Sequence, residues 1–385
     1  MSKRKLRIAH VCLAASYTEG MTYQDNILPA QNRKDGHEVL IVSNCTCYID
    51  GNMAAVAAED KLLGDGSRLV RLPFAGRLLP GYLRNKVRIT PQLASVLDSF
   101  NPDVILYHGV IGAEMLTVGA YKKKHPATRL YLDSHEDFNN SGQTLASRVL
   151  QYKLLTRFFW SRIAHQVEKV LYVSYESRDF LREMFAIPEQ QMEFYPLGGY
   201  VQEPILKAQI RQRIRASLSL GEDETVFIHA GKLDQAKRTL DILRAFLATP
   251  DPTFRLLIVG VLCDAIKYEA SPLIEADPRI RFLGWKTGAE LVDLLCAGDC
   301  YLQPGTQSAT LQVAICCGLP VMIYPHPSHI PYLMGNGYFV HSAKDIADNL
   351  PKFGDPQERS RMSKASLEIG HRLLDYRALA RRLYQ

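Results

Sequence analysis

The sequence predicts an α/β fold made of two Rossmann-like, doubly wound domains. Three observations support this prediction: short apolar runs alternate with helical patterns, the apolar runs are continuous, and the alternation breaks once near the middle. A continuous apolar run suits a parallel strand that is covered on both faces. The 385 residues suffice for two domains, or one large one, each with its own core.

The N-terminal half carries the first series of elements. We expect buried strands over 6–12, 38–43, 104–108, 130–132 and 170–173. The helical patterns between them cover residues 23–34, 90–100, 113–123 and 174–185. In such sheets ligands bind beyond the carboxyl ends of the strands, so we look for a site in the loops that follow them.

The second half repeats this organisation after a break near residues 196–199. We place an N-terminal domain over 1–200, a second domain over 201–368 and a C-terminal helix over 369–385. One possible position for this helix is against the N-terminal domain. The later strands are expected over 226–230, 254–259, 280–283, 300–303 and 321–323. Thr287 and Glu290 form a capping-box pair that predicts a helix start.

Charge and cysteine usage narrow the class of protein. The net charge of +6 fits an anionic ligand or an anionic membrane and does not require nucleic acid. No apolar run reaches the roughly 18 residues of a spanning helix, and the N-terminus does not fit a signal peptide. The eight cysteines form no CxxC pair and have no zinc-ligand spacing. We expect reduced thiols in the cytoplasm, with a disulfide or metal role as the alternative.

Two segments of the second half place cations and backbone amides after predicted strands. In the first, Gly231 ends a strand, and Lys232 and Lys237 follow before a helix begins. Cations at the end of a parallel strand, with a helix N-terminus beside them, suit a diphosphate. Lysines in a loop are also typical of a solvated surface, so the pattern alone leaves both interpretations open.

The second segment is a small polar turn between a strand and a helix. It comprises Gly305, Thr306, Gln307 and Ser308. Glycine permits close backbone approach, and Ser308 can cap the helix, whose free amides would face an anion. A glycine turn can also serve only to start the helix.

Together these segments resemble glycosyltransferase family 4, retaining enzymes of the GT-B fold, in which two Rossmann-like domains face each other across a cleft. The run at 231–237 is similar to the family's Gly-Arg/Lys…Lys motif, whose cations hold the donor diphosphate. The turn at 282–285, with Trp285, resembles the segment beside the nucleotide base, and residues 317–321 match the Cys-Gly-x-Pro-Val signature. The resemblance covers nearly the whole chain.

One motif departs from the family pattern. The family usually carries two glutamates separated by seven residues around the glycine turn, and those positions hold Gly305 and Val313 here. The Pro-Gly-Thr-Gln-Ser version of the turn resembles a subgroup of bacterial surface-polysaccharide enzymes. The departure bears on the sugar and ribose contacts and leaves the diphosphate argument in place.

In the N-terminal half the resemblance implies a further set of site residues. Gly20 would bring its amide to the donor phosphate, and Tyr23 would lie on the acceptor side. His135 is similar to the histidine of an Asp-x-His-Glu/Asp motif that contacts the donor sugar or the acceptor, and Glu136 and Asp137 are assigned to the acceptor side. A polar turn without a chemical role is the alternative.

Residues 66–97 contain no acid and carry six cations among apolar side chains. These cations are Arg68, Arg71, Arg77, Arg84, Lys86 and Arg88. Interleaving of this kind suits an anionic membrane, so we expect peripheral contact with the inner face of a membrane through residues 68–89. A solvated basic loop or an acceptor groove is the alternative.

The resemblance implies a retaining hexosyltransferase that moves a sugar from a nucleotide-diphosphate sugar to a glycan or lipid-linked acceptor in bacterial surface polysaccharide synthesis. Lys232 and Lys237, with amides near Gly305 and Gly20, would neutralise the departing diphosphate, so the scheme requires no metal and no cofactor. His135 would position the sugar or the acceptor hydroxyl. The alternatives are a non-catalytic GT-B partner subunit and a GT-B sugar-nucleotide epimerase.

Overall fold

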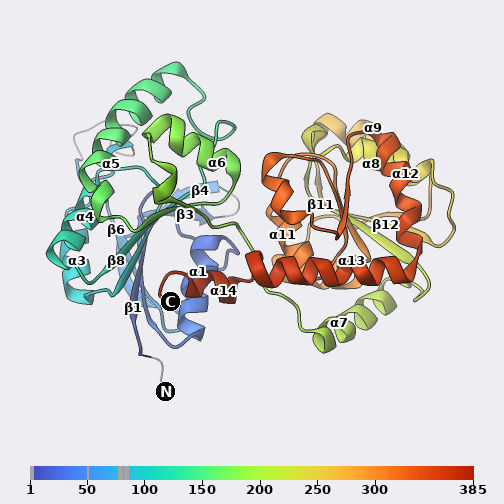
Figure 1. Ribbon diagram of the computed structural model, residues 1–385, viewed down its shortest axis with the longest axis horizontal. Helices are drawn as coiled ribbons and strands as arrows, with labels where there is room; N and C mark the ends of the chain where they lie inside the picture. Colours follow the sequence, from blue (N-terminus) through green and yellow to red (C-terminus); the bar gives the residue numbers. More distant parts are fainter. Residues whose placement is uncertain (1–3, 50–51, 77–80, 82–85) are drawn as a thin grey trace. The chain divides into compact units, whose positions relative to one another are not determined.

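The computed structural model describes residues 4–49, 52–76, 81 and 86–385 of the chain. The chain divides into two compact units (Figure 1). Unit 1 comprises Met1–Pro196 and Leu379–Gln385, and unit 2 comprises Leu197–Ala378. The sequence places the boundary after residue 200, whereas the chain leaves unit 1 after Pro196 and returns to it at Leu379.

Within the described residues, unit 1 contains an eight-stranded sheet in the order β10-β9-β8-β7-β1-β2-β6-β5, in which only β5 is antiparallel to its neighbour. The strands are β1 (Arg7–Cys12), β2 (Glu38–Asn44), β5 (Glu59–Leu62), β6 (Arg68–Leu72), β7 (Val104–His108), β8 (Arg129–Ser134), β9 (Lys169–Tyr172) and β10 (Met192–Phe194). A separate hairpin pairs β3 (Thr46–Ile49) with β4 (Asn52–Ala55). The chain order reverses between β1 and β7, which is the topological switch point of unit 1.

Helices cover both faces of this sheet (Figure 1). On one face lie α3 (Leu93–Phe100), α4 (Glu114–Lys124), the helical segment η1 (Ser147–Thr156), α5 (Arg157–Ile163), α6 (Tyr175–Phe180) and η3 (Leu181–Phe185). On the other face α1 (Gln24–Lys34) packs against β1 and β2. The five strands predicted in this half are confirmed to within two residues, because most of their residues are apolar and buried.

The stretch expected to contact a membrane differs from its prediction. Residues 68–72 form β6, in which Arg71 is buried and pairs with Glu59 at 2.8 Å. Arg68 pairs with Asp60 at 2.6 Å. Arg71 is therefore engaged within the sheet, whereas the side chain of Arg68 is 37% exposed beside Asp60. Residues 77–80 and 82–85 of the same stretch lie outside the described residues.

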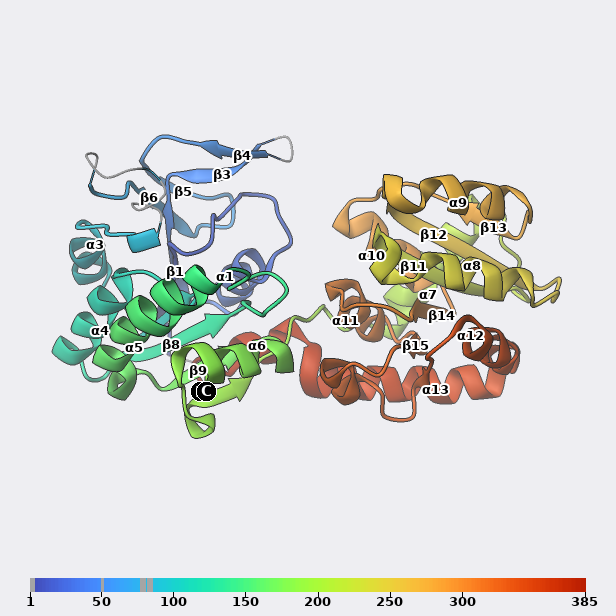
Figure 2. The same ribbon diagram turned by 90° about the horizontal axis from the view of Figure 1, so that it is seen from above.

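Unit 2 contains a six-stranded parallel sheet among its described residues, in the order β13-β12-β11-β14-β15-β16. The strands are β11 (Thr225–Leu233), β12 (Phe254–Leu262), β13 (Ile280–Phe282), β14 (Cys300–Gln303), β15 (Val321–Ile323) and β16 (Gly337–Phe339). Figure 2 shows the first five of this order one after another. The five predicted strands are confirmed, and β16 is additional. The chain order reverses between β11 and β14, which is the switch point of unit 2.

The helices of unit 2 form two groups by their contacts. The first group, in which α8 packs against the other two, is α8 (Thr239–Leu247), α9 (Asp264–Glu275) and α12 (Ala343–Asn349). The second is α7 (Pro204–Ser217), α10 (Gly288–Ala297), α11 (Ala309–Cys316) and α13 (Pro356–Ile369). The predicted capping box at the start of α10 is confirmed, since the side chains of Thr287 and Glu290 accept each other's backbone N–H groups.

The core of unit 2 fixes the strand that leads to the candidate site. Phe227 of β11 is fully buried, and its ring centroid lies 5.1 Å from Phe254, 6.0 Å from Phe353 and 6.2 Å from Phe246. Such inclined aromatic pairs stabilise a core beyond the burial of their area. These contacts hold the first part of β11, and Leu233 at its carboxyl end is fully buried in the same core.

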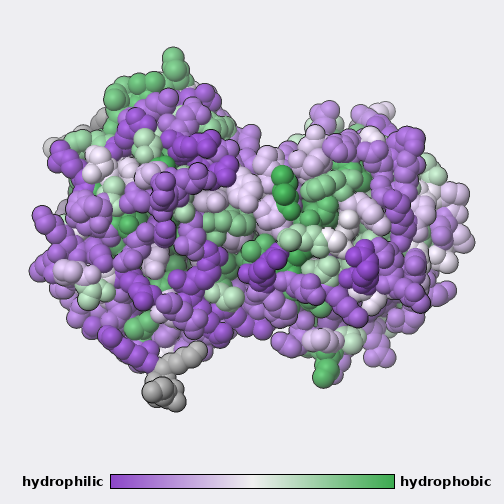
Figure 3. Space-filling view, in the orientation of Figure 1, coloured by the Kyte–Doolittle hydropathy of each residue, from purple (hydrophilic) through white to green (hydrophobic). Residues whose placement is uncertain are grey.

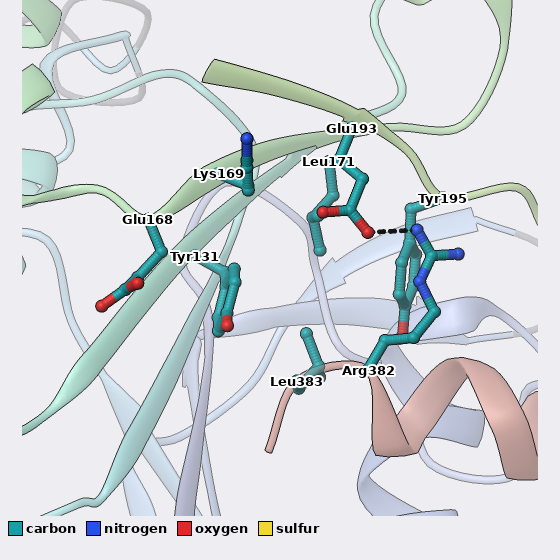
Figure 4. Close-up of a pocket in the computed structure, with 8 residues that line it drawn as sticks. All are labelled: Tyr131, Glu168, Lys169, Leu171, Glu193, Tyr195, Arg382 and Leu383. Atoms are coloured by element: carbon teal, nitrogen blue, oxygen red, sulfur yellow. Dashed lines mark hydrogen bonds and ion pairs between the residues drawn. The ribbon is translucent and has the colours of Figure 1, made fainter. Parts of the chain in front are cut away.

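The last residues of the chain pack into unit 1. A short helix, α14 (Tyr376–Arg381), begins after a break at Asp375. The hydroxyl of Tyr195 donates to the carbonyl of Leu379 at 2.7 Å, and Arg382 pairs with Glu193. This ion pair borders a pocket of about 200 Å³ (Figure 4). Its lining residues are Tyr131, Glu168, Lys169, Leu171, Glu193, Tyr195, Arg382 and Leu383, none of which is a predicted site residue.

Candidate functional site

The switch point of unit 2 carries both segments that the sequence singles out. The predicted strand end at Gly231 is two residues too early, because Gly231 and Lys232 still belong to β11 and only residues 234–237 form the loop after it. The 304–308 turn follows β14, which pairs with β11. The side chain of Asp234 accepts a hydrogen bond from the backbone N–H of Lys237 at 2.9 Å and so closes the loop tightly. Ser308 caps α11 by accepting from the N–H of Thr310 at 3.3 Å, as predicted.

Lys237 joins these two segments. Its Nζ donates to the carbonyl oxygen of Thr306 at 2.8 Å and also to the carbonyl oxygen of Gln307. In return, the backbone N–H of Thr306 donates to the carbonyl of Ala236 at 3.1 Å. Burial lowers the pKa of Lys237, and Asp234 opposes that effect. An ammonium has three donors, so the third N–H remains for another acceptor.

Gly305 allows the turn to approach the loop this closely. A Cβ at Gly305 would lie 2.2 Å from the carbonyl oxygen of Ala236 and 2.7 Å from backbone atoms of Lys237. Any side chain would therefore displace the turn or the loop. Gly305 occupies the position where the resemblance places the first glutamate. In this conformation the space for that glutamate is filled by the backbone of the lysine loop.

Lys232 and Trp285 lie along the same edge of the sheet. The side chain of Lys232 is exposed and makes no hydrogen bond or ion pair with the part of the chain that the structure describes, while its backbone pairs with β12. Trp285 follows β13 and is 68% exposed. Its turn is tied to the end of β12 by a bond from the N–H of Gly260 to the carbonyl of Gly284 at 2.8 Å. The edge thus presents a cation and, two strands away, an aromatic face.

In unit 1 a row of buried polar side chains crosses the sheet near its switch point. Nδ1 of His108 lies 2.6 Å from Oδ2 of Asp133, and Nε2 of His108 lies 3.1 Å from Nδ1 of His10. Nε2 of His10 lies 2.8 Å from the side-chain oxygen of Asn32. The backbone N–H of Gly109 donates to Asp133 at 2.9 Å. These residues come from β7, β8, β1 and α1, so they lie together only in the folded chain.

The protonation states along this row follow from burial and charge. Burial alone would lower the pKa of His108, but Asp133 and Cys12 together outweigh it and leave the pKa well above its usual value. Burial raises the pKa of Asp133, but the charge and the hydrogen bond of His108 lower it by more than burial raises it, so the net shift is downward. Burial lowers the pKa of His10 to about 3. A charged His108 therefore donates to Asp133 and to a neutral His10, which donates to Asn32.

The predicted residues after β8 lie at the exposed end of this row. The side chain of His135 is half exposed, with its Nε2 3.9 Å from Oδ2 of Asp133. The hydroxyl of Ser134 donates to Glu136 at 2.6 Å, while burial raises the pKa of Glu136. Asp137 accepts backbone N–H bonds from the two asparagines at 139 and 140, which shapes the turn. His135 is the member of this loop that is open to a ligand.

The loop after β1 carries the remaining predicted residues. Gly20 is exposed with φ +79°, and no atom would meet a Cβ there within 4 Å. Tyr23 precedes α1 and is exposed. The loop is tied to α1 because the side-chain amide of Asn26 donates to the carbonyl of Thr18 at 2.8 Å. Asp25 of α1 is near enough to His108 and His135 for their charges to lower its pKa, although burial raises it.

The predicted site residues therefore form two groups, one in each unit. The buried row through His10, Asn32 and His108 was not predicted as a unit. One signal was present: His10 stands in the middle of an apolar strand, and a buried polar group needs a partner.

Among the described residues, no group of three His, Cys, Asp or Glu side chains is arranged to hold a metal ion. No described helix is long and apolar enough to cross a membrane.

Comparison with known proteins bears on fold and family. Residues 23–198 match the family model described as a glycosyl transferase 4-like domain. No curated protein matches the sequence. Three solved structures are similar over almost the whole length. HepE from Anabaena, solved with UDP, has 15% identity and a TM-score of 0.66, with 98% of each chain covered. A glycosyltransferase from Rickettsia africae has 12% identity and a TM-score of 0.68, with 98% of this chain and 96% of that chain covered.

The third similar structure is sucrose-phosphate synthase from Thermosynechococcus elongatus. It has 17% identity and a TM-score of 0.65, with 98% of this chain and 97% of that chain covered. The fold of the chain is GT-B, which confirms the fold predicted from the sequence. At these identities the likeness bears on the fold alone.

Proposed function

We propose that this chain is a glycosyltransferase that moves a sugar from a nucleoside-diphosphate sugar to a glycan or a lipid-linked acceptor. The glycosyl transferase 4-like domain over 23–198 and the GT-B fold support this proposal. Structures of HepE with UDP and with UDP-glucose support a uridine diphosphate donor. The main support for a donor-binding site in unit 2 is the hydrogen-bonded bridge from Lys237 to the 304–308 turn. This bridge lies at the switch point, where Lys232 is exposed.

We propose transfer of a hexosyl group with retention. The bond from the anomeric carbon to the diphosphate oxygen breaks, and the electron pair leaves with the nucleoside diphosphate. The acceptor hydroxyl attacks the same face of the sugar, and its proton passes to the departing diphosphate. Lys232, Lys237 and the amides at the start of α11 stabilise the charge that develops, in a scheme that uses no metal. His135 positions the sugar or the acceptor hydroxyl.

The cellular setting is also a proposal. We propose that the protein works in the cytoplasm, at the inner face of a membrane, in bacterial surface polysaccharide synthesis. The eight thiols are all unpaired, which suits a reducing compartment. Of the predicted membrane contact through residues 68–89, the part beyond β6 stays a prediction.

The first test is calorimetric titration of the full chain with UDP, GDP and ADP, each with and without EDTA. We expect one nucleotide to bind, with the same affinity in EDTA. Lys232→Ala should weaken binding by about tenfold, because one charge-assisted contact is lost. The side chain of Lys232 is exposed and forms no hydrogen bond or ion pair with the described residues, so its removal should leave the fold intact. Lys237→Ala should weaken binding further, because it also releases the 304–308 turn.

The matched control is Lys364→Ala, an exposed lysine on α13 that lies outside the switch point. It should bind nucleotide as the wild type does. Binding of no nucleotide, or equal binding by the Lys232 and Lys364 variants, would contradict the donor site. Nucleotide binding without hydrolysis or transfer of any nucleotide sugar would favour a non-catalytic GT-B partner, the alternative that the glycine at position 305 supports.

A further inference from the structure

The helical segment that follows the His135 loop in unit 1 has an exposed apolar face. Leu145 is 79% exposed, Leu150 63%, Leu154 58% and Phe158 48%. Leu150, Leu154 and Phe158 recur every four residues along η1 and α5, which keeps them on one side of the helix. Figure 3 shows hydrophobic side chains gathered at the upper end of unit 1 in this view.

The opposite side of the same helix already supplies the packing that the fold needs. Tyr152, Phe159, Trp160 and Ile163 are buried in the core of unit 1. A surface helix normally carries one apolar stripe and a polar outer face. Here the outer face is apolar as well. Contiguous apolar patches on a surface mark sites that another surface covers.

The charges around this face have a single sign. Residues 138–167 contain four cations and no acid. The cations are Arg148, Lys153, Arg157 and Arg162. None of them makes an ion pair with the part of the chain that the structure describes. The guanidinium of Arg162 lies 4.5 Å from the ring of Phe158, so charge and apolar surface adjoin. Lys153 and Arg162 are exposed, whereas Arg148 and Arg157 are partly buried. We call Leu145, Leu150, Leu154 and Phe158, with Lys153 and Arg162, the basic apolar face.

Helix α7 of unit 2 offers a contrast. It also exposes apolar side chains, Ile205 and Leu206. Its arginines, however, pair with acids: Arg213 with Asp293 at 2.6 Å, and Arg211 and Arg215 with Asp299 at 2.8 and 2.5 Å. The cations of the basic apolar face have no such partners. Their missing counter-charges are therefore expected on whatever covers the face.

We propose that the basic apolar face binds the surface of a bilayer that contains anionic phospholipids. Leucine and phenylalanine side chains enter the acyl boundary, while arginine and lysine stems reach up to the phosphate groups. Each cation near such a surface adds attraction that salt screens. A second copy of the chain fits less well, because a two-fold contact would bring the cations of one face against the same cations of the other.

This inference is independent of the proposed transfer reaction. It concerns a surface separate from residues 68–89, and its test needs no sugar donor. If both hold, the loop with His135 precedes the membrane-bound helix by only a few residues, so a lipid-linked acceptor would arrive close to it.

The test is flotation of the full chain with two kinds of vesicles, one of phosphatidylcholine alone and one with 30 mol% phosphatidylglycerol added. We expect binding to the anionic vesicles only, weakened in 0.5 M NaCl. Leu150→Gln/Leu154→Gln should lower the partition coefficient by about tenfold or more, since two side chains lose their place in the acyl boundary. Lys153→Glu/Arg162→Glu should abolish the preference for anionic lipid.

The matched control is Ile205→Gln/Leu206→Gln, which removes two exposed apolar side chains from α7. It should float as the wild type does. All the substituted side chains are exposed, and unchanged circular dichroism will show that the variants fold. Three results would overturn the proposal. The first is no flotation of the wild type, and the second is flotation of the Leu150/Leu154 variant equal to that of the wild type. The third is a dimer of the wild type in light scattering that is absent in this variant.

Discussion

The carboxyl edges of the two sheets differ in the chemistry of the groups that fill them. In unit 2 the edge is built from Lys232, Lys237 and backbone carbonyls, with Gly305 allowing close approach. In unit 1 the corresponding edge is built from histidines and carboxylates that share protons, with His108 and Asp133 at the centre. One edge carries fixed positive charge and the other carries titratable groups.

The difference shows how each edge gains its precision. Unit 2 positions its charge by steric fit, since Gly305 sits where any side chain would meet backbone. Unit 1 positions its groups by burial, since the ring nitrogens of His10 and His108 find their partners within the row and away from water. A leaving diphosphate needs positive charge that stays in place, whereas an attacking hydroxyl needs a neighbouring group that can accept or donate a proton. The edge of unit 2 can therefore be tested by changing its steric fit, and the edge of unit 1 by changing its buried charges.

The largest effect is expected in unit 1 from Asp133→Asn. This change leaves a buried imidazolium without its carboxylate, and breaking such a pair costs about 3–5 kcal/mol of unfolding free energy. The pKa of His108 is raised in the folded chain, so its contribution is complete below about pH 6.5 and is lost as the pH rises through the raised value. The loss should therefore be larger at pH 5.5 than at pH 9, as measured by urea unfolding.

The control for this prediction is Asp98→Asn in the same unit. Asp98 also lies beside a histidine, His125, at 3.7 Å, but this pair is partly exposed. Its loss should cost no more than about 0.5 kcal/mol, because solvent screens exposed pairs. An Asp133→Asn variant as stable as the control, or one whose loss does not depend on pH, would show that the buried row is not charged.

A smaller effect is expected in unit 2 from Gly305→Ala. The added methyl group must displace the backbone of Ala236 and Lys237, which costs about 1–3 kcal/mol of stability. Nucleotide affinity should fall together with stability, because the bridge from Lys237 to the turn is broken. Gly354→Ala is the matched control, since its Cβ would meet nothing closer than Phe254 at 3.8 Å. Unchanged nucleotide binding in the Gly305 variant would separate the turn from the donor site.

Much of the fold could be predicted because buried parallel strands are continuous apolar runs. The five strands expected in each half all exist. The segment from β3 to β6 was missed because these strands are short and partly exposed, and β6 contains two arginines. Its arginines were interpreted as membrane-facing, since the sequence does not show that Glu59 and Asp60 lie opposite them.

The candidate site shows the same limit. The sequence predicted that Lys237 and the 304–308 turn serve one ligand, but not that Nζ of Lys237 bonds the turn itself, because the two lie far apart along the chain. His10, Asn32 and His108 come from three elements, and no spacing relates them. A sequence pattern shows which loops end at one edge of a sheet. It does not show which side chains there bond to each other.

The smallest effect at neutral pH concerns His229, a buried histidine of β11 beneath the lysine loop. Its Nδ1 donates to the carbonyl of Leu302 at 2.8 Å, and burial lowers its pKa to about 4. Below about pH 6.5 the unfolded chain takes up a proton that the folded chain refuses until about pH 4. The free energy of unfolding should therefore decrease as the pH is lowered across this window, by up to about 1.4 kcal/mol per pH unit from this one group.

The test is His229→Asn, which can keep a donor for the Leu302 carbonyl while removing the titrating ring. Urea unfolding between pH 4.5 and pH 7.5 should give a shallower dependence on pH for this variant than for the wild type. His371→Asn changes an exposed histidine of the same unit and should leave the dependence unaltered. Parallel curves for the wild type and the His229 variant would mean that the folded ring takes up a proton as readily as the unfolded ring does. In that case unit 2, like unit 1, would bury a proton-sharing group beneath its site, and the contrast between the two edges would fail.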